Sequence, residues 1–163
     1  MNRLVVAAAA AALLVLPCVT NAQAPAAPPA YGLGISMEAA KKAMAAAEAE
    51  AKKNNWPVAI AIVDSSSKLA AFSKMDNTQH GSVDIAIGKA TTANNLRRPT
   101  KALQDGIAQG GANLRMLGQP GITPLEGGVP IIVDGKIIGA IGVSGVASDQ
   151  DAQVAMAGAA AAK

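Results

Sequence analysis

His80 is the only histidine in this chain of 163 residues, and imidazole is the side chain best suited to bind a metal or move a proton near neutral pH. It lies in the polar segment 76–81, just before a predicted helix. With no second histidine, a two-histidine metal site is excluded. Two interpretations remain open, an exposed loop histidine or a single axial ligand to a haem iron. Met75 could pack against a porphyrin or supply a sulfur ligand, and the alternative is a core methionine at the end of a strand.

The other reactive side chains do not form a catalytic pattern. Ser144 lacks the G-x-S-x-G spacing of a nucleophile elbow, and no histidine follows it. Lys89 and Lys136 could form Schiff bases, but lysine is usually a solvated surface charge. Asp149 and Asp151 fit the first turn of a helix, where the helix dipole favours acids. Neither G-x-G-x-x-G nor G-x-x-x-x-G-K-S/T occurs, so no phosphate-binding loop is predicted.

The segment Gly127–Gly145 contains six of the 16 glycines of the chain. Its β-branched halves, 129–133 and 136–143, are joined by Asp134-Gly135, a pair typical of a tight type I′ hairpin turn. Glycine within a strand weakens it and indicates a bulge or a close approach to another surface. That surface could be a packed helix, a cofactor or another subunit, and the missing phosphate motifs favour a structural role.

The first 24 residues have the pattern of a secretory signal peptide. A short basic start precedes the apolar run 4–16, and Ala22-Gln23-Ala24 offers small residues for cleavage after Ala24, with Ala22 as an alternative. The sequence therefore predicts a periplasmic or secreted protein that is not inserted in the membrane after cleavage. Cys18, the only cysteine, would be removed, so the mature chain can form no disulfide.

Charge and aromatic content argue against nucleic-acid binding. Removal of Arg3, the one charged residue of the signal peptide, lowers the formal net charge from +3 to +2, and the remaining basic residues are scattered. A nucleic-acid surface needs a concentrated basic stripe, usually with aromatic platforms, but the only aromatic residues are Tyr31, Trp56 and Phe72. A domain with so small an aromatic core would gain from self-association, so we expect a homo-oligomer.

The order of predicted elements indicates an α+β domain with an antiparallel sheet covered by helices. After the signal peptide, residues 25–33 are a Pro/Ala linker that should stay extended, exposed and unpaired. The domain occupies 34–163. Its predicted elements are a helix over 37–53 capped by Ser36, strands 56–64 and 68–75, a helix from Ser82 to before Pro99, a short helix to Ala108, a long loop with one helical turn over 110–128, the glycine-rich hairpin, and a helix over 148–162.

Several segments in this order resemble the GlcG/HbpS family, which also forms the C-terminal domain of PduO-type proteins. Together they extend over essentially all of residues 33–162. The matching pieces are Val63-Asp64, Leu69 to Phe72, Lys74-Met75-Asp76, Ser82, Asp84-Ile85-Ala86, Lys89-Ala90-x-Thr92-Ala93, Gly127-Gly128-Val129-Pro130, Gly139 to Gly145, Asp151, and Ala155 to Gly158.

The resemblance implies a profilin-like fold, with a five-stranded antiparallel sheet between helical layers, and usually a compact oligomer. It also implies haem as the cofactor, in haem capture, storage or sensing. One relative uses a threonine as axial ligand near the helix motif that includes Thr92 here, so Thr92 is a candidate by position and His80 by chemistry. We favour His80, because imidazole is a far better iron ligand than a hydroxyl.

The primary hypothesis is therefore an exported, non-catalytic haem-binding protein, with His80, Thr92 and Met75 as candidate cofactor-binding residues and His80 as the metal ligand. One alternative is an accessory or catalytic protein for a small organic acid or aldehyde, with Lys89 and Asp151 as its polar groups. A second is a structural oligomer that modulates a membrane sensor. Only the haem hypothesis needs a coordinating side chain at position 80.

Overall fold

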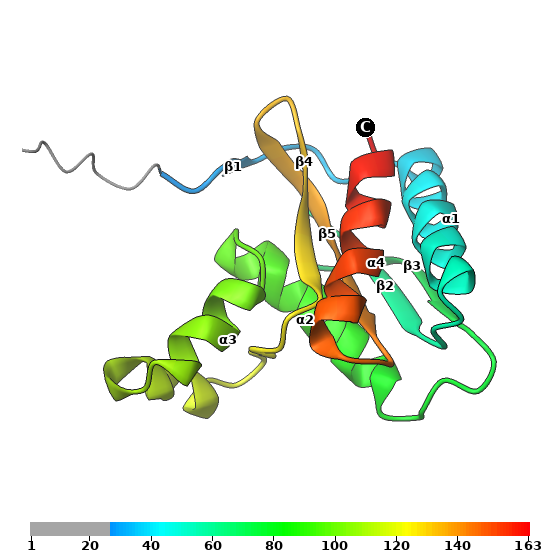
Figure 1. Cartoon of the computed structure of the whole chain (residues 1–163). Coiled ribbons are helices and arrows are strands. Elements are labelled where there is room, and N and C mark those ends of the chain that lie inside the picture. Colours follow the sequence, from blue (N-terminus) through cyan, green and yellow to red (C-terminus); the bar gives the residue numbers. More distant parts are fainter. Residues whose placement is uncertain (1–26) are drawn as a thin grey trace, which may run out of the picture.

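A sheet of five strands, covered by helices on both faces, forms the centre of the fold (Figure 1). The computed structural model describes residues 27–163, so the predicted signal peptide, 1–24, lies outside the described residues. The elements in chain order are β1 (Ala30–Tyr31), α1 (Met37–Lys53), β2 (Ala59–Asp64), β3 (Leu69–Lys74), α2 (Ser82–Leu96), α3 (Lys101–Ala108), the 3₁₀ helix η1 (Gly111–Gly118), β4 (Gly128–Val133), β5 (Lys136–Ser144) and α4 (Ser148–Ala161).

Strand β5 organises the sheet. It pairs antiparallel with β4 and with β2, and β2 pairs antiparallel with β3. The predicted five-stranded α+β architecture is confirmed, with one difference, because β1 pairs parallel to β5. Asp134 and Gly135, at the tip of the β4–β5 hairpin, both have positive φ angles, 49° and 72°, as a type I′ turn requires.

The prediction that residues 25–33 pair with no strand is wrong. Ala30 and Tyr31 pair with the start of β5, and the N–H of Gly32 donates to the carbonyl of Ile137 at 2.8 Å. The last proline of the segment is Pro29, so the residues after it keep their N–H donors. The Tyr31 hydroxyl donates to a carbonyl near the end of α2, that of Asn94, at 2.9 Å. Its described residues, 27–33, are extended and mostly exposed as predicted, but the segment is anchored at its end.

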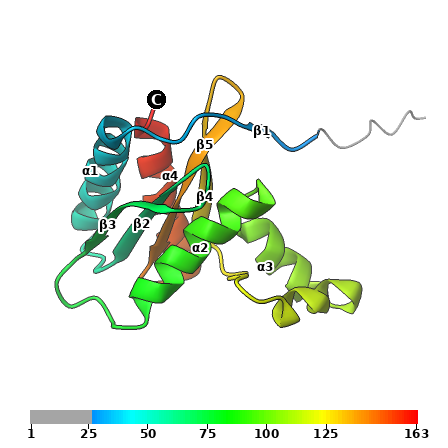
Figure 2. The same ribbon diagram turned by 180° about the vertical axis from the view of Figure 1, so that it is seen from behind.

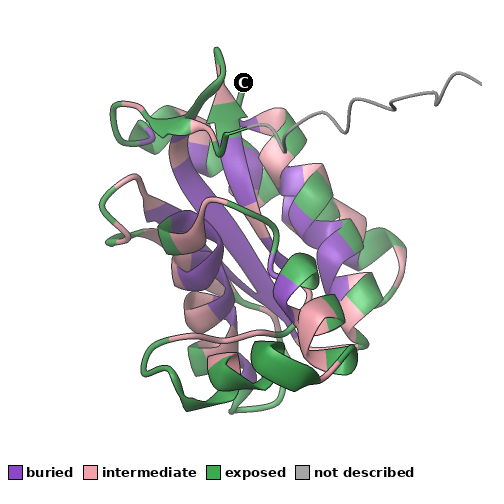
Figure 3. Ribbon diagram, turned by 90° about the vertical axis from the view of Figure 1, so that its left-hand side faces the viewer, coloured by how far each residue is buried: buried purple, intermediate pink, exposed green. Residues whose placement is uncertain are grey.

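Strand β2 is buried on both faces, with large side chains on one and small ones on the other. Ile60 and Ile62 face α1 and α4, and Ala59 and Ala61 face α2. The view from behind shows α2 crossing the face opposite to α1 and α4 (Figure 2). Strands β2 and β5 are the most continuously buried part of the fold, and the outer faces of the helices are exposed (Figure 3).

Gly142 of β5 explains how α2 comes so close to the sheet. A Cβ atom at this position would collide with the carbonyl oxygen of Ala86 and the backbone nitrogen of Ala90, both in α2. Helix backbone therefore lies directly against strand backbone, which is the close approach that glycine within a strand permits. This contact confirms the structural interpretation of the glycine-rich hairpin.

The helices follow the sequence prediction closely. Helix α1 spans the predicted residues, and the Ser36 Oγ accepts the N–H of Ala39 at 3.1 Å as its N-cap. Strand β2 begins at Ala59, later than predicted, because Pro57 has no N–H to donate to a sheet. The segment 110–128 was expected to contain one helical turn, and it holds the eight-residue 3₁₀ helix η1.

Candidate functional site

The three candidate haem residues lie in two separate places. His80 and Met75 belong to the connection between β3 and α2, which we call the β3–α2 loop (residues 75–81). Thr92 lies ten residues into α2, about 15 Å along the helix from Ser82 at 1.5 Å per residue. His80 and Thr92 therefore lie toward opposite ends of the helix, and the structure does not bring them together around one iron.

His80 is exposed, and its imidazole makes no hydrogen bond to any residue in 27–163. The backbone around it is ordered by turns. The Thr78 side chain donates to the carbonyl of Met75 at 2.8 Å, and the N–H of Val83 donates to the carbonyl of His80 at 3.3 Å. A loop ordered by turns thus presents an exposed imidazole that is bonded to no residue in 27–163.

Met75 is half-buried and packs against the core between the sheet and helices α1 and α4. It follows β3 directly, and its N–H donates to the carbonyl of Val58 at 3.0 Å. The structural interpretation, a methionine of the core at a strand end, therefore describes part of its role. Its other surface lines an open pocket, described next.

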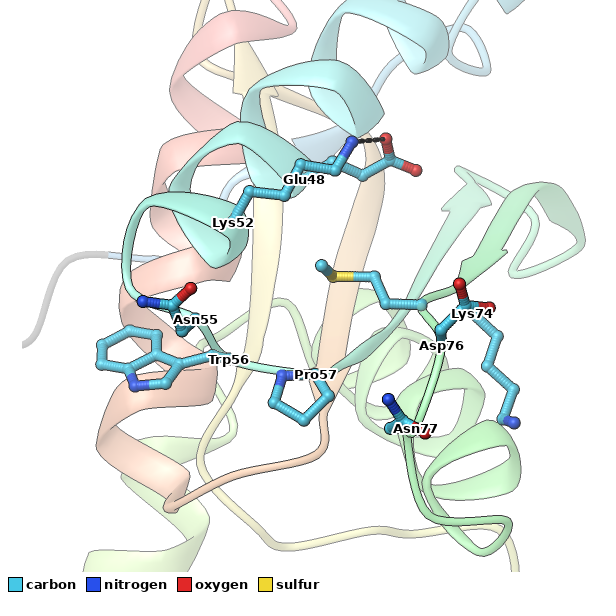
Figure 4. A pocket seen from close by; sticks show the side chains of 9 residues that line it. Glu48, Lys52, Asn55, Trp56, Pro57, Lys74, Asp76 and Asn77 are labelled. Atoms are coloured by element: carbon cyan, nitrogen blue, oxygen red, sulfur yellow. Dashed lines mark hydrogen bonds and ion pairs between the residues drawn. The ribbon is translucent and has the colours of Figure 1, made fainter.

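A pocket of about 560 Å³ lies between the end of α1, the segment 55–57 and the β3–α2 loop. We call it the Trp56 pocket, and its lining residues are Glu48, Lys52, Asn55, Trp56, Pro57, Lys74, Met75, Asp76 and Asn77. Figure 4 shows Trp56 and Lys74 on opposite sides of it, with Pro57 between them. His80 follows Asn77 by three residues, which is at most about 10 Å of extended chain. The sequence analysis missed this pocket, because its walls come from two stretches of chain, 48–57 and 74–77, that are separate in the sequence.

Thr92 is completely buried. Its Oγ1 accepts the N–H of Thr123 at 2.8 Å, which ties α2 to the segment before β4. A threonine ligand to iron would have to break this hydrogen bond and become exposed. In this conformation the hydroxyl has a structural role.

Lys89 and Asp151 form a buried ion pair between α2 and α4. The Lys89 Nζ donates to Asp151 Oδ2 at 2.7 Å and to the carbonyl of Val143 at 2.9 Å, and both residues are at most 2% exposed. Burial raises the pKa of the Asp151 carboxyl above its usual value, and this effect outweighs the opposing effect of the Lys89 ammonium.

The backbone of Gly127 packs directly against this ion pair. A Cβ atom there would lie 2.8 Å from Lys89 Nζ and 2.9 Å from Asp151 Cβ. The sequence analysis placed Asp151 in the first turn of a helix. There its Oδ1 accepts the N–H of Val146 at 3.2 Å. The sequence analysis named Lys89 and Asp151 together as polar groups of one alternative, and the folded structure brings them into direct contact although they are 62 positions apart.

The described residues contain no group of three or more histidine, cysteine, aspartate or glutamate side chains placed to hold a metal ion. A haem differs from a bare ion, because its ring supplies four of the ligands and the protein needs to supply only one or two axial ones. An exposed single imidazole therefore fits a haem better than it fits a free cation.

Comparison with known proteins gives a consistent result. The model of the family described as "Haem degrading protein HbpS-like" matches residues 35–160. The chain is 45% identical to protein GlcG of Escherichia coli strain K12 over 110 residues, which are 68% of this chain and 81% of GlcG.

Two solved structures share the fold over most of their length. The crystal structure of HbpS has a TM-score of 0.73 and 33% identity, covering 84% of this chain and 96% of HbpS. That of the PduOC:heme complex has a TM-score of 0.73 and 28% identity, covering 79% of this chain and 95% of the other. The order of the sequence motifs, the five-stranded sheet and these matches together show that the chain belongs to the HbpS-like family, the GlcG/HbpS family that its sequence resembles.

Proposed function

We propose that this protein is an exported haem-binding protein that captures, stores or senses haem, with His80 as the axial ligand to the iron. The observation that carries the proposal is the exposed imidazole of His80, which has no hydrogen-bond partner among residues 27–163 and is presented by an ordered loop beside an open pocket. The HbpS-like family description and the similar PduOC structure, solved with heme, support haem as the ligand.

The alternative ligands fit less well. Thr92 would need to break its hydrogen bond to Thr123 and leave the interior. Met75 lies in the wall of the Trp56 pocket, and its thioether could contact the porphyrin or lie near the iron. When bound, haem would supply an iron centre able to take ligands or electrons, and His80 would hold it in place.

We propose binding rather than catalysis. The polar groups of the organic acid or aldehyde alternative are Lys89 and Asp151, and the Lys89 ammonium is sealed behind Gly127. An amine must reach its substrate to form a Schiff base, so this arrangement favours a structural role for the pair.

Export and assembly belong to the same proposal. The signal peptide pattern of residues 1–24 supports a periplasmic or secreted location. Among the described residues, no helix is both long and apolar enough to cross a bilayer. Exposed leucines near the α3–η1 region, Leu114, Leu117 and Leu125, support a homo-oligomer, and a membrane sensor is a possible partner of a haem sensor.

The experiment is a titration of the purified mature protein with hemin, followed by the Soret band. We expect a saturable shift for the native protein and for Thr92→Ala, and a strongly weakened or altered band for His80→Ala. No saturable shift in the native protein would refute haem binding. An unchanged band in His80→Ala would remove only the assignment of the axial ligand.

A further inference from the structure

We propose that the Trp56 pocket is where the porphyrin ring binds, and that Lys74 pairs there with a carboxylate of the ring. This inference rests on the proposed haem function and locates it on the molecule. The pocket combines two kinds of surface that a flat, dicarboxylic macrocycle requires. One is an apolar wall for the ring, and the other is a cation for its acidic edge.

The apolar wall consists of Trp56, Pro57 and Met75. Trp56 is half-buried and packs against the main core, which holds its ring in a fixed place. Aromatic and thioether side chains both make favourable contacts with a flat π-system. The volume of about 560 Å³ lies within the range typical of small-molecule sites.

The cation is Lys74, at the end of β3. It is exposed, and within residues 27–163 its ammonium forms no ion pair with a carboxylate. The second lysine of the pocket, Lys52, is already paired with Glu48 at 3.4 Å. Glu48 also accepts a hydrogen bond from Ser73 at 2.6 Å, so its charge is partly satisfied by the protein itself. Lys74 is therefore the pocket cation most available to an incoming carboxylate.

The position of His80 agrees with this assignment. Asn77 lines the pocket and His80 follows after three residues, so the imidazole can lie at the rim of the same pocket. Trp56 and Lys74 lie on opposite sides of the pocket, with Pro57 between them (Figure 4). A ring that contacts Trp56 and Pro57 can thus direct its acidic edge toward Lys74.

The first test compares hemin with hemin dimethyl ester, which keeps the ring and lacks the two negative charges. Lys74→Glu should weaken hemin binding roughly tenfold, because an attraction becomes a repulsion, and should leave binding of the ester unchanged. Lys68→Glu is the matched control, since it makes the same charge change at the other end of β3, outside the pocket. Its hemin affinity should equal that of the native protein.

The second test uses gallium protoporphyrin, a diamagnetic analogue, and follows the indole N–H resonance of Trp56 by NMR. Trp56 is the only tryptophan of the chain, so the signal is unambiguous. Ring-current shifts act over only a few ångströms, and we expect a clear shift at saturation.

The outcomes separate this inference from the proposed function. A native Soret shift together with an unmoved indole resonance, or with equal effects of Lys74→Glu and Lys68→Glu, would overturn the Trp56 pocket and leave haem binding intact. Absence of the Soret shift in the native protein would overturn both. A shifted indole and a loss specific to Lys74→Glu and to hemin would support the pocket.

Discussion

Replacing Lys89 with methionine should destabilise the fold by an amount that depends strongly on pH. The substitution keeps much of the side-chain volume but removes the ammonium that lies 2.7 Å from Asp151 Oδ2. Asp151 is then a buried carboxylate without a cation, and an isolated buried charge is so costly that the group takes up a proton instead.

The free energy of protonating Asp151 sets how much Lys89→Met destabilises the fold. The carboxyl has an ordinary pKa of 3.8, and protonating it at pH 7 costs about 1.4 kcal/mol for each pH unit above that value, or about 4 kcal/mol in total. At pH 5 the same step costs only about 1.6 kcal/mol. The lost hydrogen bond to the Val143 carbonyl adds about 1 kcal/mol at either pH.

The direction of the pKa shift of Asp151 decides whether stability rises or falls with pH. A buried acid whose pKa is raised holds its proton more tightly in the folded state than in the unfolded chain. Its contribution to stability is therefore fully present below about pH 3.8 and is lost as the pH rises through the raised pKa. Lys89→Met removes the ammonium that opposes this shift, so the pKa of Asp151 rises further. The variant therefore loses more stability between pH 5 and pH 7 than the native protein does.

The assay is urea unfolding at pH 5, 6 and 7. Lys89→Met should lose about 4 kcal/mol or more at pH 7 and about 2 to 3 kcal/mol less at pH 5. The double variant Lys89→Met/Asp151→Asn has no titrating group there and should lose the pH dependence. Lys42→Met breaks an exposed pair with Glu38 and should change stability little at each pH, because solvent screens this pair. A loss below about 1 kcal/mol at pH 7, or one equal at pH 5 and 7, would refute the reasoning.

Three further predictions test other contacts. Gly142→Ala should cost at least about 1–3 kcal/mol, measured by urea unfolding, because its Cβ would meet the backbone of α2, whereas Gly118→Ala, with open space around it, should change stability by less than about 0.5 kcal/mol. Tyr31→Phe should cost about 1 kcal/mol and increase amide exchange of Gly32, and unchanged exchange would argue against β1 as an anchored strand. Thr92→Ala should lower thermal stability by about 1–2 kcal/mol, and full stability would show that its hydrogen bond to Thr123 contributes nothing.

Local patterns predicted most of the secondary structure, because local interactions decide it. Helix α1 has its cap at Ser36 and the predicted bounds, and the β4–β5 turn follows from Asp134-Gly135. The prediction that residues 25–33 pair with no strand was wrong, because each proline lacks an N–H donor only at its own position, and Ala30 and Tyr31 keep theirs. Tyr31 gains its position from carbonyls at the end of α2, more than 60 residues away.

The candidate site was predictable only in part. A single histidine in a polar loop makes His80 a candidate coordinating side chain, since its chemistry depends on residue type and not on position in the fold. Thr92 was a candidate by position in a motif, and the structure places it in the interior with its hydroxyl bonded. Neither assignment contained Lys74 or Trp56, because the Trp56 pocket combines the end of α1 with the end of β3.

By itself, the sequence determined the compositional class, the approximate elements of the α+β fold and the one imidazole available for iron. Those features depend on residue types and short spacings. Only the tertiary structure decided which lysine is sealed and which is exposed, because burial and partners come from segments far apart in the chain. Lys89 lies among small residues of α2 and pairs with Asp151 of α4, while Lys74 faces an open pocket. The same side chain is thus structural at one position and a candidate for ligand binding at the other.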